Sequence, residues 1–265
     1  MIFIKKCNRM LFCLFFFTNI IINFSYGQKI SQQDYRIIID YCSEKIKEAP
    51  DYYYYYEGRA DAKLALGKYI EAVDDYTMAI KRNKLCSTAF YDRGIAWFQI
   101  NNMDSAKLDF IRAIKLKKNP EAYHYLGLID ETKKEYSQAI ANYGKAIKDS
   151  ITYADAYYNR GLCLSYIKDY QNAIENFKNV VKVKENINAR INIAYNYSKL
   201  KKFDDAEREI NLLLQKDTIS NTIYRYKGLI AFEKNDTMKA CEFFTKAKKL
   251  GAKNVDEDIK KCCNH

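Results

Sequence analysis

The sequence contains few residues that interrupt helices. Proline occurs twice and glycine nine times in 265 residues. Proline removes a backbone donor and clashes inside a helix, and glycine lowers helix stability, so their scarcity favours a chain that is helical almost throughout. Because 48% of the residues are hydrophobic, the chain also has enough apolar side chains for a sizeable core.

Residues and motifs typical of catalysis are also scarce. The chain has two histidines, His124 and His265, and it lacks a phosphate-binding loop, a dinucleotide fingerprint, a nucleophile elbow and paired metal-ligand spacing. The terminal run Cys262-Cys263-Asn264-His265 is a poor metal site, because adjacent cysteines reach one tetrahedral ion only with strain. Glu131 is a candidate neighbour of His124, but no nucleophile accompanies the pair. We therefore expect no enzymatic activity, no cofactor and no metal.

The first 27 residues differ from all that follow. Three basic residues precede an apolar stretch over residues 10–24, and Ser25 and Gly27 come after it. A basic start, a short apolar core and small residues before a cleavage point are typical of a secretory signal peptide, here with cleavage before Gln28. We expect residues 1–27 to direct export to the periplasm or the cell exterior. The alternative is an uncleaved anchor that keeps the N-terminus in the membrane.

The formal charge of +11 does not by itself indicate nucleic-acid binding. Without the three basic residues of the N-terminal segment, which has no acidic residue, the charge is +8. Basic and acidic residues alternate along the chain, as in residues 204–209, and no long basic run occurs. This pattern favours solvated helix faces, and a basic helical-repeat nucleic-acid binder is kept as a less favoured alternative.

Export would place the cysteines in an oxidising compartment, where some of them can pair. Cys163 is expected inside a packed helix as a small core residue. Cys241, Cys262 and Cys263 belong to the last helix pair and its cap, so a disulfide among them is geometrically plausible. Which cysteines pair is left open.

Small residues recur at a nearly constant interval. One set has successive spacings of 34, 33, 34, 33 and 34 and consists of Ala72, Ala106, Ala139, Ala173, Ala206 and Ala240. A second set, twelve residues upstream, is Ala60, Gly94, Gly127, Gly161, Ala194 and Gly228. Four residues after the first set come Tyr76, Phe110, Tyr143, Phe177, Ile210 and Phe244. A phase shared by small and large residues indicates a structural repeat.

This pattern resembles the tetratricopeptide repeat. The resemblance covers residues 53–254 as six units, with a half repeat over 28–52 before them and a capping helix over 255–265 after them. It implies an all-α, right-handed superhelical solenoid of antiparallel helix pairs. The small residues would lie where the paired helices cross, and the aromatic residues would fill the space between neighbouring pairs.

Two details of the repeat carry further expectations. The fifth unit departs most from the pattern, because Arg190 replaces an aromatic residue and Ile210 replaces a phenylalanine or tyrosine. Looser packing is expected there. Asp104, Asp169 and Asp204 are expected to cap the second helices of their units.

In this family the first helix of each unit lines a concave face. The resemblance therefore implies a partner-binding groove formed by Tyr91, Ile95, Phe98, His124, Leu128, Tyr158, Leu162, Ile191, Tyr195 and Arg225. Aromatic anchors commonly dominate peptide recognition. The alternative is that several of these residues only pack against adjacent helices. A clamp for a terminal carboxylate, known in some family members, is not expected because Glu57 and Asp61 would repel it.

Together these features predict a non-catalytic protein–protein interaction scaffold in the cell envelope. It would bind a protein or peptide segment in the groove. An accessory subunit of an envelope enzyme or transport complex is the alternative, and it differs only in the identity of the partner. No nucleic-acid partner is expected, and membrane contact is expected only through an uncleaved N-terminal segment.

Overall fold

The computed structural model describes residues 30–149, 153–214 and 220–263, and every regular element in these ranges is an α-helix. The predicted signal segment, residues 1–27, lies outside the described residues. The helices are α3 (Gln32–Glu48), α4 (Tyr53–Ala65), α5 (Tyr69–Arg82), α6 (Ser87–Gln99), α7 (Met103–Leu116), α8 (Pro120–Thr132), α9 (Tyr136–Asp149), α10 (Ala154–Tyr166), α11 (Tyr170–Val183), α12 (Ile187–Lys199), α13 (Phe203–Leu214), α14 (Asn221–Glu233), α15 (Thr237–Lys249) and α16 (Asp256–Cys263).

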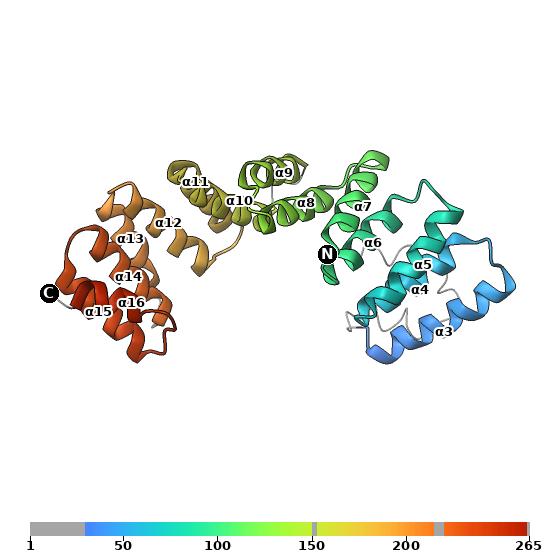
Figure 1. The fold of residues 1–265 in the computed structure, drawn as a ribbon, viewed down its shortest axis with the longest axis horizontal. Helices are drawn as coiled ribbons and strands as arrows, with labels where there is room; N and C mark the ends of the chain where they lie inside the picture. Colours follow the sequence, from blue (N-terminus) through green and yellow to red (C-terminus); the bar gives the residue numbers. More distant parts are fainter. Residues whose placement is uncertain (1–29, 150–152, 215–219, 264–265) are drawn as a thin grey trace. The chain divides into compact units, whose positions relative to one another are not determined.

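The chain divides into two compact units, and the boundary in the sequence falls in the first turn of α8. In the N-terminal unit, which ends at Ala122, the helices α3 to α7 pack on one another in sequence. In the C-terminal unit, which begins at Tyr123, α10 to α15 form three antiparallel pairs and α16 packs against α15 (Figure 1). The predicted all-α fold of stacked tetratricopeptide-like helix pairs is confirmed.

Each helix pair is closed by a small residue that faces a large one. A Cβ atom added at Gly94 would lie 2.8 Å from the ring of Phe110, and one added at Gly161 would lie 2.9 Å from that of Phe177. Gly127 and Gly228 have the same relation to the rings sixteen residues later. At these four crossings only glycine leaves room for the aromatic ring, whereas the first pair places Ala60 in the same cluster as Tyr76.

The fifth helix pair, α12 and α13, has different residues at this crossing. Ala194 and Ile210 occupy the glycine and aromatic positions, and both lie in one buried cluster. Arg190, which replaces the usual aromatic residue, forms ion pairs with Glu185 at 2.6 Å and with Glu209 at 3.0 Å. An aliphatic pair and an ion-pair network thus replace two aromatic positions of the repeat.

The turn inside each helix pair has a left-handed residue. A positive φ between 57° and 74° occurs at Gly67, Asn101, Lys134, Lys168, Lys201 and Asn235. The amide of the next residue donates to a carbonyl five residues back, as Asp169 does to Leu164 at 2.9 Å. This is the hydrogen bond of a Schellman motif, which ends the first helix and positions the second.

The residue after this turn is the N-cap of the second helix. Asp169 caps α11 as predicted, because its side chain accepts from the amide of Asn172. The predictions for Asp104 and Asp204 were wrong by two residues. Asn102 caps α7 by accepting from Ser105 at 3.2 Å, and both aspartates lie within the first turn of their helices.

Within the described ranges, no helix is both long enough and apolar enough to cross a membrane.

We predict that Gly161→Ala lowers the free energy of unfolding by about 1–2 kcal/mol, because the new methyl group overpacks against Phe177. In a Phe177→Ile background, Gly161→Ala should leave the free energy of unfolding almost unchanged. The combination of alanine and isoleucine then matches Ala194 and Ile210 of the fifth pair. Thermal and urea unfolding of the four proteins measure this coupling. Gly144→Ala is the matched control: its Cβ would meet only the end of the Arg160 side chain, at 3.4 Å, and alanine should stabilise the helix.

Equal costs for Gly161→Ala in the two backgrounds would contradict this description of the helix crossing.

Candidate partner-binding face

We define the first-helix face as the side chains of α4, α6, α8, α10, α12 and α14 that lie three or two residues before, or one, four or five after, the small residue of the crossing. In the N-terminal unit this face is only partly accessible. Tyr91 is 9% exposed and its ring lies 5.9 Å from that of Phe110, so it belongs to the core. Ile95 and Phe98 are half-buried.

In the C-terminal unit, His124 is enclosed by aromatic rings. Its ring lies 5.6 Å from Tyr143 and 5.0 Å from Tyr153, and its Nε2 atom is 3.0 Å from the amide nitrogen of Asn159. Burial lowers the pKa of His124, although Asp155 acts in the opposite direction. The side chain is therefore a neutral hydrogen-bonding link between α8 and α10.

The next two first helices are also joined by a hydrogen bond. Tyr158 on α10 accepts from the Asn192 amide of α12 at 3.2 Å. Burial raises the pKa of Tyr158, while this hydrogen bond partly offsets the rise. Leu162 and Leu128 are half-buried and pack against the adjacent core.

Two further predicted groove residues, like Tyr91, contact neighbouring parts of the protein. Ile191 is only 3% exposed, so its side chain belongs to the core of the fifth pair. Arg225 points toward the C-terminal helix, where its Nε atom lies 3.6 Å from Asp258 of α16. Both residues pack against neighbouring helices, as the alternative interpretation of the sequence anticipated.

Tyr195 lies at the centre of the remaining accessible surface. Its ring is 5.9 Å from that of Tyr226 on α14, at an interplanar angle of 88°. Lys199 lies over the Tyr195 ring at 5.3 Å and forms an ion pair with Glu233. An aromatic contact and an ion pair therefore connect α12 to α14. In the ion pair, Lys199 and Glu233 neutralise each other.

Sequence reasoning missed several residues of this face, including Tyr166, Tyr226 and the amides of Asn159 and Asn192. All except Tyr166 lie two residues before the small residue of the crossing, a position that the sequence analysis did not consider. Polar or aromatic residues recur there in Tyr125, Asn159, Asn192 and Tyr226. That recurrence was the available signal.

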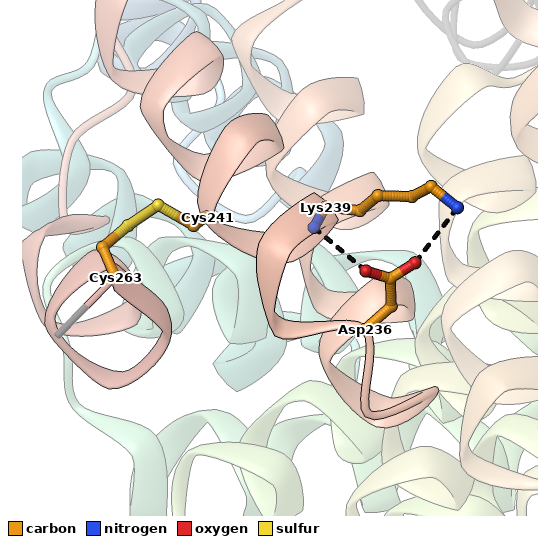
Figure 2. The surroundings of a disulfide bond; sticks show 4 residues. All are labelled: Asp236, Lys239, Cys241 and Cys263. Carbon is orange, nitrogen blue, oxygen red and sulfur yellow. Dashed lines mark hydrogen bonds and ion pairs between the residues drawn. A yellow bond between two sulfur atoms is a disulfide. The ribbon is translucent and has the colours of Figure 1, made fainter. Parts of the chain in front are cut away.

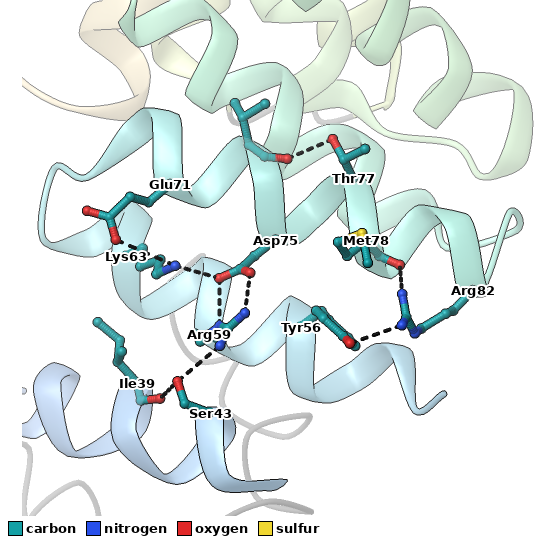
Figure 3. A network of polar contacts seen from close by, with 11 residues as sticks. Ile39, Ser43, Tyr56, Arg59, Lys63, Glu71, Asp75, Thr77, Met78 and Arg82 are labelled. Carbon is teal, nitrogen blue, oxygen red and sulfur yellow. Dashed lines mark hydrogen bonds and ion pairs between the residues drawn. The ribbon is translucent and has the colours of Figure 1, made fainter. Parts of the chain in front are cut away.

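A second repeated contact lies behind the face and was also missed. Arg59 donates to both carboxylate oxygens of Asp75, at 2.8 and 2.7 Å, and to the Ser43 hydroxyl at 3.0 Å (Figure 3). One guanidinium thus joins α3, α4 and α5, and Lys63 also contacts Asp75 at 2.9 Å. The same three-helix contact recurs one repeat later in Arg93, Asp109 and Thr77.

In the C-terminal unit the same position carries a neutral partner, because Arg160 donates to Asn176 at 2.7 Å. Burial lowers the pKa of Arg160, whereas the side-chain hydrogen bond to Asp75 raises that of Arg59. Arginine directly before the small residue, with an acid or amide sixteen residues later, is the sequence signature of this contact. Its role is structural, because the groups are paired and largely buried.

The buried polar groups also do not form a catalytic arrangement. The Tyr143 hydroxyl donates to Glu131 at 2.8 Å, and burial raises the pKa of this tyrosine well above its usual range. Burial raises the pKa of the Cys163 thiol to about 12, so it stays protonated and unreactive. Among the described side chains, no group of three or more His, Cys, Asp or Glu is placed to hold a metal ion.

The C-terminal helix is held by a disulfide between Cys241 of α15 and Cys263 of α16 (Figure 2). Their Cα atoms are 5.3 Å apart. Of the three cysteines that the sequence left open, Cys262 is the unpaired one, and it is buried between the same helices. Cys42, Cys86 and Cys163 are buried and take no part in a disulfide. The disulfide ties the cap to the last helix pair.

Three models of the tetratricopeptide repeat match the chain, over residues 58–123, 132–164 and 154–187. Residues 58–123 and 132–187 thus consist of tetratricopeptide repeats. None of the three models describes a catalytic domain, and proteins of this type are typically non-catalytic scaffolds that bind protein or peptide partners.

Similar proteins share this repeat and fold. Human tetratricopeptide repeat protein 13 is 32% identical over 120 residues, which is 45% of this chain but only 14% of that protein. The C-terminal part of a repeat protein from Cytophaga hutchinsonii superimposes with a TM-score of 0.69 at 18% identity, covering 86% of this chain and 94% of that one. YrrB, described as having an unusual peptide-binding site, gives a TM-score of 0.58 at 18% identity, with coverages of 79% and 98%.

We predict that acidification destabilises the fold through His124. Because burial lowers its pKa below the usual 6.5, the unfolded chain binds the proton first as the pH falls. The free energy of unfolding should therefore decrease as the pH drops below about 6.5. In His124→Gln this decrease should be smaller, as measured by urea unfolding between about pH 7.5 and 5.5. The same pH dependence in the wild-type protein and in His124→Gln would contradict the role of His124 in this destabilisation.

Reduction should destabilise the C-terminal pair. The disulfide closes a segment with a sequence separation of 22, so its loss should cost about 3 kcal/mol through greater freedom of the unfolded chain. Unfolding of Cys241→Ser with Cys263→Ser measures this cost, and Cys262→Ser in the oxidised protein is the control for packing. Labelling of the unfolded, unreduced protein should leave Cys241 and Cys263 unmodified. Reaction of both thiols without reduction would refute the pairing.

Proposed function

We propose that this protein is an exported, non-catalytic scaffold that binds a protein or peptide segment on its first-helix face. The observation that carries the proposal is the accessible aromatic surface of α10, α12 and α14 in the C-terminal unit. Tyr158, Tyr195 and Tyr226 are half-buried, and Tyr166 at the end of α10 is 63% exposed. The peptide-binding site named for YrrB supports this use of the fold.

The proposed organisation follows from the sequence pattern. Residues 1–27 would act as a signal peptide, 28–52 as a half repeat, 53–254 as six repeats and 255–265 as a cap. Export to the periplasm or the cell exterior is consistent with the Cys241–Cys263 disulfide, since disulfides persist in oxidising compartments. An accessory subunit of an envelope enzyme or transport complex is the same proposal with a particular kind of partner.

Site-specific photo-crosslinking in the native host tests this function. A photoreactive amino acid replaces Tyr166 on the first-helix face, and the matched control replaces Met238, which is 84% exposed on α15 of the same unit. We predict a protein adduct from position 166 and none of the same mass from position 238. Tyr195→Ala should abolish the adduct through loss of an aromatic anchor, and circular dichroism of that variant checks its folding.

Adducts of equal yield from both positions, or none from position 166, would exclude the first-helix face as the binding surface. N-terminal sequencing of the same purified protein tests export. A mature chain that begins at Gln28 is the expected result, and a chain that retains Met1 in the cytoplasmic fraction contradicts it.

A further inference from the structure

We propose that the C-terminal unit binds an extended, proline-containing peptide segment on a platform of four tyrosines, Tyr158, Tyr166, Tyr195 and Tyr226. This inference rests on the proposed function, because it names the chemistry of the partner at the first-helix face. We call these four residues the tyrosine platform. They belong to three consecutive first helices, α10, α12 and α14.

Tyr226 is a neighbour of the other three tyrosines. Its phenol lies within electrostatic range of those of Tyr195, Tyr158 and Tyr166, so that ionisation of any of them would raise its pKa. Tyr226 and Tyr195 meet edge to face, and the Tyr158 ring packs edge to face against Phe177 at 5.5 Å. A partner that crosses the three helices would therefore contact neighbouring rings in succession.

Packing holds these rings in place before a partner binds. Tyr166 stacks on Tyr136 at 5.0 Å with an interplanar angle of 15°, which supports one face of its ring while the side chain remains 63% exposed. Tyr195 contacts both Tyr226 and Lys199. Binding to such a surface restricts little side-chain freedom, so little affinity is lost to ordering.

The platform offers hydroxyl donors. The Tyr158 oxygen already accepts from Asn192, so its own proton is free to be donated to a partner. Burial raises the pKa values of Tyr158 and Tyr226, which keeps both phenols protonated at neutral pH. Complementary groups on a partner are carbonyl oxygens and apolar surface.

Two basic residues on the platform's helices, Lys199 and Arg225, have acidic neighbours. Lys199 contacts Glu233, and Arg225 faces Asp258. A charged peptide side chain would have to break one of these pairs to find its own partner there. Electrostatic complementarity thus favours an uncharged segment at this surface.

A proline-containing segment fits these requirements. Proline has a carbonyl acceptor but no amide proton, so it presents the acceptors that phenol hydroxyls need without adding donors. A proline-rich segment adopts the extended, left-handed polyproline II helix, which exposes its backbone and loses little entropy on binding. Aromatic-lined grooves recognise this helix in other proteins. An oligosaccharide also stacks on tyrosine, but its many hydroxyls would need several acceptors. One oxygen of Glu233 and the Tyr158 oxygen each already accept a hydrogen bond, from Lys199 and Asn192.

Calorimetric titration of the oxidised chain tests the proposal with three probes: decaproline, a glycine–serine decamer and chitohexaose. We expect decaproline to bind at least about tenfold more tightly than the glycine–serine decamer, because it is ordered before binding. Tyr195→Phe and Tyr226→Phe should each weaken it about fivefold through loss of one hydrogen bond. Tyr197→Phe is the matched control on α12. The Tyr197 hydroxyl lies outside the platform and accepts a hydrogen bond of 2.8 Å from Lys178.

Three results would overturn the inference: no binding of decaproline, equal binding of the two decamers, or equal effects of Tyr195→Phe and Tyr197→Phe. Binding of chitohexaose alone would assign the platform to sugars instead. The sequence of the partner segment that crosslinks to position 166 distinguishes failure of the proline inference from failure of the scaffold function. A partner segment without proline leaves the scaffold function in place and removes this inference, whereas failure of crosslinking removes the scaffold function.

Discussion

The close crossing of two helices at a small residue is the contact on which the rest of the structure depends. At Gly161 the backbone of α10 lies against the ring of Phe177, so closely that a methyl group would not fit. This contact fixes how the first helix is rotated about its axis. Side chains three before and one or four after the glycine then occupy a common face, and Tyr158 and Tyr195 lie on it because of their distance from a crossing point. The first-helix face is therefore a consequence of packing.

Polar contacts between successive first helices complete that face. The hydrogen bond between His124 and Asn159 connects α8 to α10, and the one between Tyr158 and Asn192 connects α10 to α12. In three of the pairs a guanidinium, that of Arg59, Arg93 or Arg160, joins the two helices behind the face. Because each repeat contacts mainly its neighbours, these contacts help to fix the position of one repeat against the next. They also use most of the polar groups near the rings, so what is left for a partner is aromatic surface and a small number of hydroxyls.

The fold could be predicted from the sequence because the crossing contact has a simple signature, a small residue followed by a large one sixteen positions later. The groove could be predicted only in part. Tyr91 and Ile191 have the right spacing, but spacing does not reveal how far a neighbouring helix covers a side chain, and both are buried. Arg225 was expected in the groove and instead faces α16, whose position depends on a disulfide that sequence spacing left open. The left-handed lysines of the turns, such as Lys168, were missed because lysine is not typical of that conformation.

The central claim is that the partner lies on the first helices and leaves the second helices free. Hydroxyl-radical footprinting of the protein with and without its captured partner measures this directly, because it reports the solvent access of individual side chains. The account predicts that the partner strongly reduces oxidation of Tyr166 on α10 and leaves that of Met238 on α15 unchanged, both being well exposed in the free chain. Protection of Met238 with Tyr166 still fully reactive would contradict it.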